Sequence, residues 1–248
     1  VTYGGFLSLA KNAEQDGIIL IDSLDASEEL ANLGTNSFAV GIYDESIGYA
    51  IADYLAENGI DKIGLISNLE DPFIFLVKNA VKNKYVGEVK EEMYTFNDKD
   101  FRTLLAKLSP FDYIVLLGWE ETGLVVRQAR ELGMKTQFIG IDTFSSENFK
   151  RNTNNNVEGL LFTFWQGAEG NEIYKTMILD YNLQFNKAPE NVLFVATGYD
   201  AMAVLGKVMR DCEDKVDCVG ARLKSSIKDF QGATGSITMD QDGITRSI

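Results

Sequence analysis

Several side chains suited to holding a small polar molecule directly follow the predicted strands. The stretches 4–8, 22–27, 67–68, 118–120 and 142–143 contain hydroxyls, carboxylates, one indole and glycines that expose backbone amides. Small-molecule sites use such groups for orientation and specificity. Because ligands of parallel sheets bind beyond the carboxyl ends of the strands, we expect a binding site at this edge.

Asp142 is the most informative of these residues. It follows the apolar segment 137–141, so its carboxylate could either cap the next helix or pair with a cation. Serines at strand ends, such as Ser8 and Ser27, are also common helix caps. The sequence alone leaves the capping and the binding interpretation open for each of them.

The residues that many enzymes need are missing from the sequence. The chain of 248 residues has no histidine, which excludes Ser-His-Asp triads, Cys-His dyads and His-containing zinc sites. It also has no GxGxxG, GxxxxGKS/T or GxSxG motif. Adjacent carboxylates such as Glu91 and Glu92 are typical of solvated faces in a chain with 37 acidic residues. We therefore expect neither catalysis nor a bound cofactor or metal.

Charge and hydropathy exclude further classes of partner. The 23 basic and 37 acidic residues give a formal net charge of −14, and the sequence pI is about 4.5. Such a field repels polyanions, so we expect no nucleic acid and no acidic lipid surface as a partner. The hydrophobic content of 45% suffices for one large core or two smaller ones. No apolar run approaches the roughly 20 residues that cross a bilayer.

The two cysteines, Cys212 and Cys218, enclose a short acidic segment. Their spacing is neither that of a CxxC redox pair nor that of a zinc knuckle. In an oxidising compartment they could form a disulfide, whereas in the cytosol they would be two free thiols. Spacing alone does not choose between these states.

Short apolar strands alternate with amphipathic helices as far as residue 142. This βαβα order predicts an α/β protein with mostly parallel sheets flanked by helices. The expected strands are 1–3, 18–21, 63–67, 89–96, 113–117 and 137–141, and the expected helices are 47–58, 75–84, 101–108 and 122–132. The first strand should run into a glycine turn at Gly4-Gly5.

The pattern changes after the polar stretch 151–156, which is rich in turn-forming residues and should be a surface loop. An extended segment over 157–164 follows, and then two long helical patterns over 172–185 and 192–211. The tail 232–243 contains an Asp-Gly turn between β-prone residues, which predicts a β-hairpin.

Four stretches resemble the type 1 periplasmic binding-protein superfamily, in the branch of the leucine/isoleucine/valine-binding proteins. Residues 97–108 match the start of a family helix, and residues 127–140 match a helix-to-strand junction. Residues 198–202 and 232–243 resemble two further family signatures in the expected order. Together the matches extend over essentially the whole chain.

The resemblance implies two α/β lobes that close on a solute in the cleft between them. Lobe one would contain residues 1–43 and 164–235, lobe two residues 44–163, and residues 236–248 a hairpin and a third interlobe crossing. The family's opening strand-helix-strand-helix unit has no counterpart before Val1. We therefore expect lobe one to be incomplete, with its first strands upstream of this chain.

The resemblance also assigns ligand contacts to individual positions. Ser8 lies where the family binds the ligand carboxylate, and Ala26 and Ser27 lie at the next such loop. Trp119 takes the place of an aromatic that covers the ligand, and Asp142 that of the acid that pairs with its ammonium group. The aromatic expected after the strand 63–67 is displaced by one residue, to Phe73.

By resemblance, the chain is an extracytoplasmic solute-binding protein of an ABC transporter. It would capture an amino acid, with Trp119 and Phe73 favouring an apolar or branched-chain-like one, and deliver it to the transporter permease. It would be a monomer located in the periplasm or outside the cell, either free or attached by a lipid anchor. The alternative is an extracellular ligand-sensing receptor domain of the same fold, and a small-molecule enzyme is a weaker third hypothesis.

Overall fold

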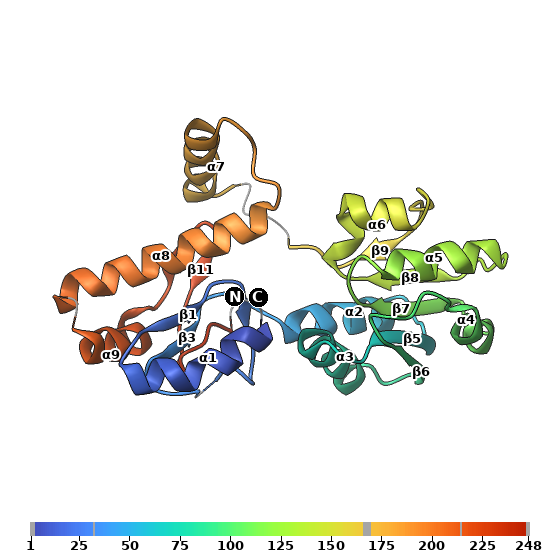
Figure 1. Cartoon of the computed structure of the whole chain (residues 1–248), viewed down its shortest axis with the longest axis horizontal. Helices are drawn as coiled ribbons and strands as arrows, with labels where there is room; N and C mark the ends of the chain where they lie inside the picture. The colour runs from blue at the N-terminus through green and yellow to red at the C-terminus, as the bar shows by residue number, and fades with distance from the viewer. Residues whose placement is uncertain (1–2, 32, 166–169, 214, 247–248) are drawn as a thin grey trace. The chain divides into compact units, whose positions relative to one another are not determined.

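The computed structural model describes residues 3–31, 33–165, 170–213 and 215–246. The chain forms two compact units (Figure 1): unit 1 comprises Val1–Asp44 and Gln166–Ile248, and unit 2 comprises Glu45–Trp165. Each unit has its own strands and its own hydrophobic core. Both units combine helices with parallel strands, so the predicted α/β class is confirmed.

Unit 2 is built on a parallel sheet of five strands in the order β6-β5-β7-β8-β9. The inner strands are apolar almost throughout, because helices cover both faces of a parallel sheet. Strands β5, β7 and β8 are neighbours, so the segments that follow their carboxyl ends lie side by side. The strands are β5 (Lys62–Asn68), β6 (Glu88–Tyr94), β7 (Tyr113–Leu117), β8 (Gln137–Gly140) and β9 (Leu161–Phe162).

Helices cover both faces of this sheet (Figure 1). Two of them pack on one face around Leu65 and Val115, and three pack on the other face around Ile66 and Phe138. The first group is α2 (Glu45–Glu57) and α3 (Pro72–Lys84), and the second is α4 (Arg102–Leu108), α5 (Thr122–Glu131) and α6 (Glu147–Asn152).

Unit 1 contains short strand pairs and four helices among its described residues. Strand β1 (Leu20–Asp22) pairs in parallel with β3 (Ser37–Ala39), and β2 (Asp25–Ala26) with β4 (Ile42–Tyr43). Near the C-terminus, β10 and β11 form an antiparallel hairpin, and a second turn brings Met239 opposite Thr245. The remaining elements are α1 (Tyr3–Asp16), α7 (Glu172–Phe185), α8 (Val192–Cys212), α9 (Val216–Ser226), β10 (Phe230–Gln231) and β11 (Ser236–Ile237).

Helix α1 stands where the sequence predicts a strand and a glycine turn. The predicted strand is wrong at Tyr3, which begins the helix, and Val1 and Thr2 lie outside the described residues. Gly4 and Gly5 belong to the helix instead of forming a turn. The helix is held by an apolar face with the three- and four-residue spacing of an amphipathic helix, made of Tyr3, Phe6, Ala10 and Ala13.

Helix α8 is the helix, among the described residues, that is long and apolar enough to cross a bilayer. The expectation that no apolar stretch approaches this length is therefore wrong, because the first 18 residues of α8 contain only two charged residues, Asp200 and Lys207. Its buried face packs in the core of unit 1 through Ala201, Val204 and Val208. The core helix of a globular unit meets the same criteria, so length and composition do not give α8 a membrane role.

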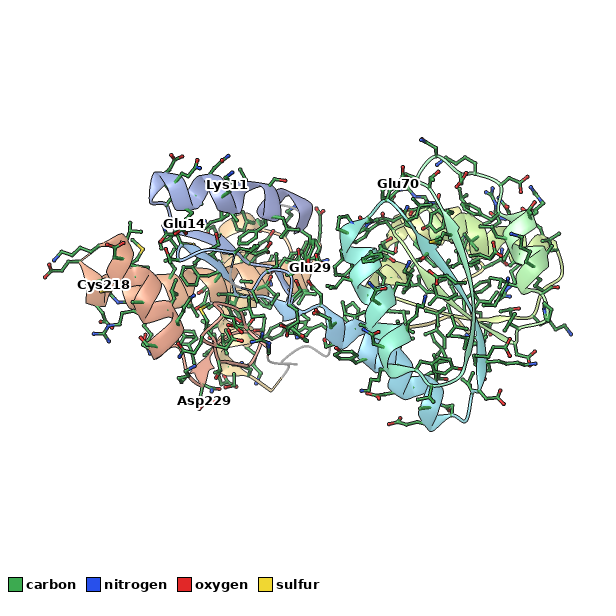
Figure 2. The ribbon with its side chains drawn as sticks, turned by 90° about the horizontal axis from the view of Figure 1, so that it is seen from below. Lys11, Glu14, Glu29, Glu70, Cys218 and Asp229 are labelled. Atoms are coloured by element: carbon green, nitrogen blue, oxygen red, sulfur yellow. A yellow bond between two sulfur atoms is a disulfide. The ribbon has the colours of Figure 1, made fainter. Side chains whose placement is uncertain are left out.

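A disulfide joins Cys212, the last residue of α8, to Cys218 in α9 (Figure 2). The two Cα atoms are 5.6 Å apart. Between the helices Glu213 adopts a left-handed conformation with φ 49°, which ends α8. The bond therefore links two helices that share one hydrophobic core.

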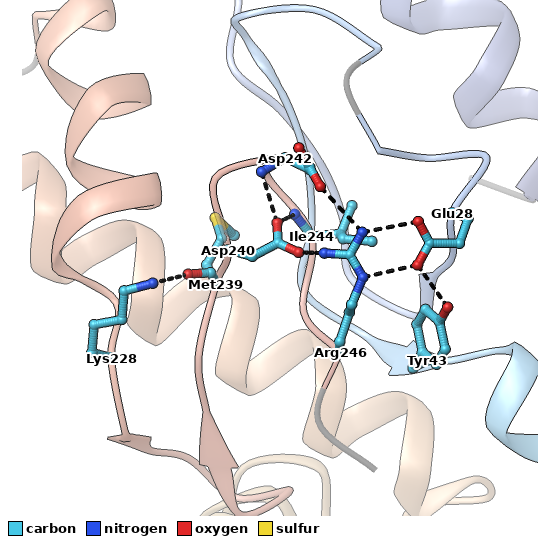
Figure 3. Close-up of polar contacts among 8 residues, drawn as sticks. All are labelled: Glu28, Tyr43, Lys228, Met239, Asp240, Asp242, Ile244 and Arg246. Atoms are coloured by element: carbon cyan, nitrogen blue, oxygen red, sulfur yellow. Dashed lines mark hydrogen bonds and ion pairs between the residues drawn. The ribbon is translucent and has the colours of Figure 1, made fainter.

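The guanidinium of Arg246 connects three segments of unit 1 (Figure 3). Its Nε and Nη2 each donate to one carboxylate oxygen of Glu28 at 2.9 Å. Arg246 also pairs with Asp240 and, at 3.2 Å, with Asp242 in the last turn. The Tyr43 hydroxyl donates to Glu28 at 2.8 Å. One cation thus fastens the C-terminal segment to the loop after β2 and to the end of β4.

We expect acid to loosen this connection. Hydrogen bonds from Arg246 and then from Tyr43 lower the pKa of Glu28 to about 2. A lowered pKa in the folded state stabilises the fold above the ordinary value near 4.5, and this stabilisation disappears as the pH falls towards 2. Urea midpoints of the wild type should therefore fall more steeply between these pH values than those of Glu28→Gln.

The matched control is Asp16→Asn, which removes an exposed carboxylate of the same unit. Its midpoints should follow the wild-type curve. Parallel curves for the wild type and Glu28→Gln would contradict a stabilising role for the Glu28–Arg246 pair.

Candidate functional site

The carboxyl edge of the unit 2 sheet brings together three of the predicted site residues. Phe73 lies in the first turn of α3, which follows β5, and Trp119 lies between β7 and α5. Asp142 follows β8 and begins a short 3-10 helix, η1 (Asp142–Ser145). Because these three strands are adjacent in the sheet, the three residues come from neighbouring loops.

Phe73 and Trp119 form an aromatic pair. Their ring centroids are 5.6 Å apart and the ring planes are inclined by 23°, so the rings are stacked. Both side chains are half-buried. The pair thus presents a partly exposed, flat apolar surface at this edge of the sheet.

The position of Phe73 follows from the way α3 begins. Asp71 is the N-cap, and its Oδ1 accepts hydrogen bonds from the amides of Phe73 and Ile74 at 2.9 and 3.1 Å. Pro72 occupies the first helical turn, where its fixed φ is favourable. The helix therefore starts three residues before the predicted range 75–84, and Phe73 is a helical residue.

The backbone around Trp119 is held by a buried network. Oε1 of Glu121 accepts from the Tyr94 hydroxyl at 2.8 Å and from the Trp119 amide at 3.3 Å. Burial, and then the negative charge of Glu121, raise the pKa of Tyr94, which therefore stays a hydroxyl donor. A Cβ at Gly118 would collide with the Tyr94 hydroxyl, so this position requires glycine.

Asp142 has an electrostatic environment that favours a cation. Burial raises the pKa of its carboxyl group, and the charge of Glu120 raises it further, while the backbone amide of Thr143 opposes this shift. Among the described residues, no positive charge contributes to the shift. Asp142 is the first residue of η1 and not its cap, because Ile141 holds the cap position without a side-chain hydrogen bond, so the capping interpretation is wrong here. The negative charge of Asp142 has no balancing partner in unit 2.

Of the predicted residues of unit 1, Ser27 directly follows strand β2, whereas Ser8 is not at a strand end. Ser8 lies on α1 and not after a strand, and its exposed hydroxyl donates to the carbonyl oxygen of Gly4 at 2.9 Å. Ala26 is buried in β2. Ser27 is also buried, and its hydroxyl lies 2.9 Å from that of Tyr3. Whether these residues contact a ligand stays a prediction.

Three residues of the unit 2 network were not predicted: Asp71, Tyr94 and Glu121. The Asp-Pro pair at 71–72 indicates a helix start, so the capping role of Asp71 was open to prediction. Its second contact, in which Oδ2 accepts from the Trp119 indole Nε1 at 2.7 Å, joins residues 48 positions apart. No local pattern signals such a contact.

The features of unit 2 away from this edge of the sheet give less support for a binding site. A recess of about 320 Å³ lies at the opposite, amino-terminal edge of the sheet, where Asp112 and Lys135 contribute to its lining. It contains none of the predicted site residues. Within the described ranges, no group of three or more His, Cys, Asp and Glu side chains is placed to hold a metal ion.

Comparison with known proteins extends over nearly the whole chain. The model of a family described as "Periplasmic binding protein" matches residues 3–246. The leucine-, isoleucine-, valine-, threonine- and alanine-binding protein of Pseudomonas aeruginosa is 24% identical over 240 residues, which are 93% of this chain and 63% of that protein. The Leu/Ile/Val-binding protein of Escherichia coli is 25% identical over 239 residues, 93% of this chain and 64% of that protein.

Solved structures show the same fold. A leucine binding protein LivK from Thermotoga maritima superimposes with a TM-score of 0.87 at 24% identity, covering 99% of this chain and 72% of that one. LivJ from Streptococcus pneumoniae, in complex with isoleucine, gives 0.82 at 24% identity, covering 98% and 71%. The chain therefore has a two-lobed α/β fold, and it spans less than two thirds of the length of the curated relatives above.

Proposed function

Because the chain belongs to the type 1 periplasmic binding protein family, in its leucine/isoleucine/valine-binding branch, we propose that it captures an amino acid for an ABC transporter. The ligand would be apolar and branched-chain-like. The protein would release it to a transporter permease without changing it chemically. The family is one of solute-binding proteins, which supports binding without catalysis.

The observation that carries this proposal is the uncompensated carboxylate of Asp142. Burial and the charge of Glu120 both disfavour its ionised form, and a ligand ammonium group would offset both effects. The stacked rings of Phe73 and Trp119 at the same edge of the sheet suit an apolar side chain. Unit 2 would therefore recognise the ammonium group and the apolar side chain of the ligand.

Two further features support an extracytoplasmic location. The Cys212–Cys218 disulfide is typical of proteins in oxidising compartments. The family model that matches residues 3–246 of this chain is described as "Periplasmic binding protein". We propose a monomer that acts in the periplasm or at the outer cell surface, where a lipid anchor would keep it near the permease.

Calorimetric titration tests the proposal. The panel would contain leucine, isoleucine, valine, alanine and arginine, together with 4-methylpentanoate, which is leucine without its ammonium group. We expect saturable binding of the branched-chain amino acids and none of 4-methylpentanoate, because only the amino acids bring a cation to Asp142. Absence of binding for every amino acid, by a folded protein, would contradict the proposal.

A sensing receptor domain of the same fold is the alternative. Structures described as extracellular ligand-binding receptors share the fold, for example one from Desulfohalobium retbaense with a TM-score of 0.71 at 16% identity. Both functions predict amino-acid binding, so titration does not separate them. Stimulation of a permease's transport by the ligand-loaded protein would favour the transport function.

A further inference from the structure

We propose that Asp71 is a positioning residue, which holds Phe73 and Trp119 as one rigid aromatic surface for the ligand. This inference rests on the proposed function, because it assumes that the two rings contact the bound amino acid. It adds a residue that contacts the backbone of Phe73 and the indole of Trp119, and not the ligand.

Each carboxylate oxygen of Asp71 accepts a hydrogen bond from a different member of the aromatic pair. Oδ1 accepts from the Phe73 amide at 2.9 Å and so fixes the start of α3, from which the phenyl ring projects. Oδ2 accepts from Nε1 of the Trp119 indole at 2.7 Å. The carboxylate thus connects the backbone beneath one ring with the edge of the other.

The hydrogen bond between the Trp119 indole and Asp71 fixes the side-chain orientation of Trp119, which the backbone contacts do not determine. Glu121 and Thr122 already hold the main chain of Trp119, since the Trp119 amide donates to Glu121 and the Thr122 hydroxyl donates to the Trp119 carbonyl at 2.6 Å. The side-chain torsions of Trp119 are set only by packing and by Nε1. Without Oδ2, the half-buried indole would rotate away from the stack with Phe73.

Only a carboxylate can make both contacts in this geometry. Asparagine has one acceptor oxygen, and its NH₂ group would face the indole donor. Serine has one short hydroxyl that can cap α3 but does not reach across to Trp119. Aspartate, asparagine and serine are similarly good N-caps, so both replacements should keep α3 intact and remove the indole contact.

The experiment therefore uses Asp71→Ser and Asp71→Asn. The matched control is Asp112→Asn, which removes one negative charge at the opposite edge of the same sheet. Two measurements are made on each protein: the indole N–H resonances by ¹H–¹⁵N NMR without ligand, and the affinity for leucine by calorimetry. The chain has two tryptophans, so a spectrum of Trp165→Phe assigns the Trp119 resonance.

In the wild type we expect a downfield Trp119 indole proton that exchanges slowly with water. In both Asp71 variants it should move upfield and exchange faster, with the thermal midpoint nearly unchanged. Leucine affinity should fall about tenfold in both variants, the scale of losing one hydrogen bond to a charged group. Asp112→Asn should match the wild type in both measurements.

Each failure has a distinct meaning. An unchanged Trp119 indole resonance in the Asp71 variants would overturn the inference. A shifted resonance with unchanged leucine affinity would also overturn it, because the contact would then be purely structural. If the wild type binds no amino acid of the panel, the proposed function and the role in ligand binding both fail, whereas the resonance still decides whether Asp71 holds the indole.

Discussion

Asp142→Ala is expected to weaken amino-acid binding by about 2–5 kcal/mol, the usual loss when one partner of a buried charge pair is removed. The reason is that the ligand ammonium group would lose its counter-charge. No described contact places Glu120 where its carboxylate could substitute for that of Asp142. Calorimetric titration of leucine measures the change. Asp112→Asn is the control for the loss of one negative charge from unit 2.

The affinity should also depend on pH through Asp142. Burial and Glu120 raise the pKa of the Asp142 carboxyl group in the free protein, and an ammonium ligand would lower it again. Binding should therefore weaken as the pH falls through this raised pKa, because protonation removes the charge that the ligand needs. Asp142→Asn should bind weakly at every pH tested. An affinity that is unchanged in Asp142→Ala would show that Asp142 does not pair with the ligand ammonium group.

Asp200→Ala is expected to lower the free energy of unfolding by about 3 kcal/mol, since it removes a buried acceptor of several hydrogen bonds. Asp200 is 1% exposed and lies on α8. Its carboxylate accepts from the Ala233 amide at 2.5 Å and from the amide and hydroxyl of Thr234 at 2.8 and 2.6 Å. Without it, these donors near the β10–β11 hairpin lose their partner.

Urea unfolding followed by far-UV circular dichroism measures this loss. The control is Asp211→Ala, an exposed acid at the end of the same helix, which should leave the midpoint unchanged. Both tryptophans lie in unit 2, so Trp fluorescence would keep its wild-type midpoint if the units unfold separately. A wild-type circular dichroism curve for Asp200→Ala would contradict the importance assigned to this acceptor.

Elements with a strong local pattern were predicted well. Strand β7 and helix α7 have the predicted bounds, 113–117 and 172–185. In β7 an apolar run is bounded by turn residues, and in α7 Asn171 caps the start while Asn186 ends the helix in a left-handed conformation. Local chemistry determines such elements, because the signals lie within a few residues of each boundary.

Elements with weak or ambiguous patterns were missed. Helix α1 was taken for a strand and a turn, because the pair Gly4-Gly5 is typical of turns and hides the apolar spacing that follows. Strands β2 and β4 have two residues each and no alternation that could reveal them. Their pairing with each other, and not any local preference, makes them strands.

The class of this protein follows from its amino-acid sequence, which indicates an α/β fold, polar residues at strand ends and a family, and which places Asp142, Trp119 and Phe73 at one edge of a sheet. Which side chains meet depends on the tertiary structure. Asp71 reaches Trp119 across 48 positions, Asp200 reaches Thr234 across 34, and Arg246 reaches Glu28 across 218. Such contacts depend on how strands and helices pack, and periodicity reports only the face on which a residue lies, not the partner that it meets there.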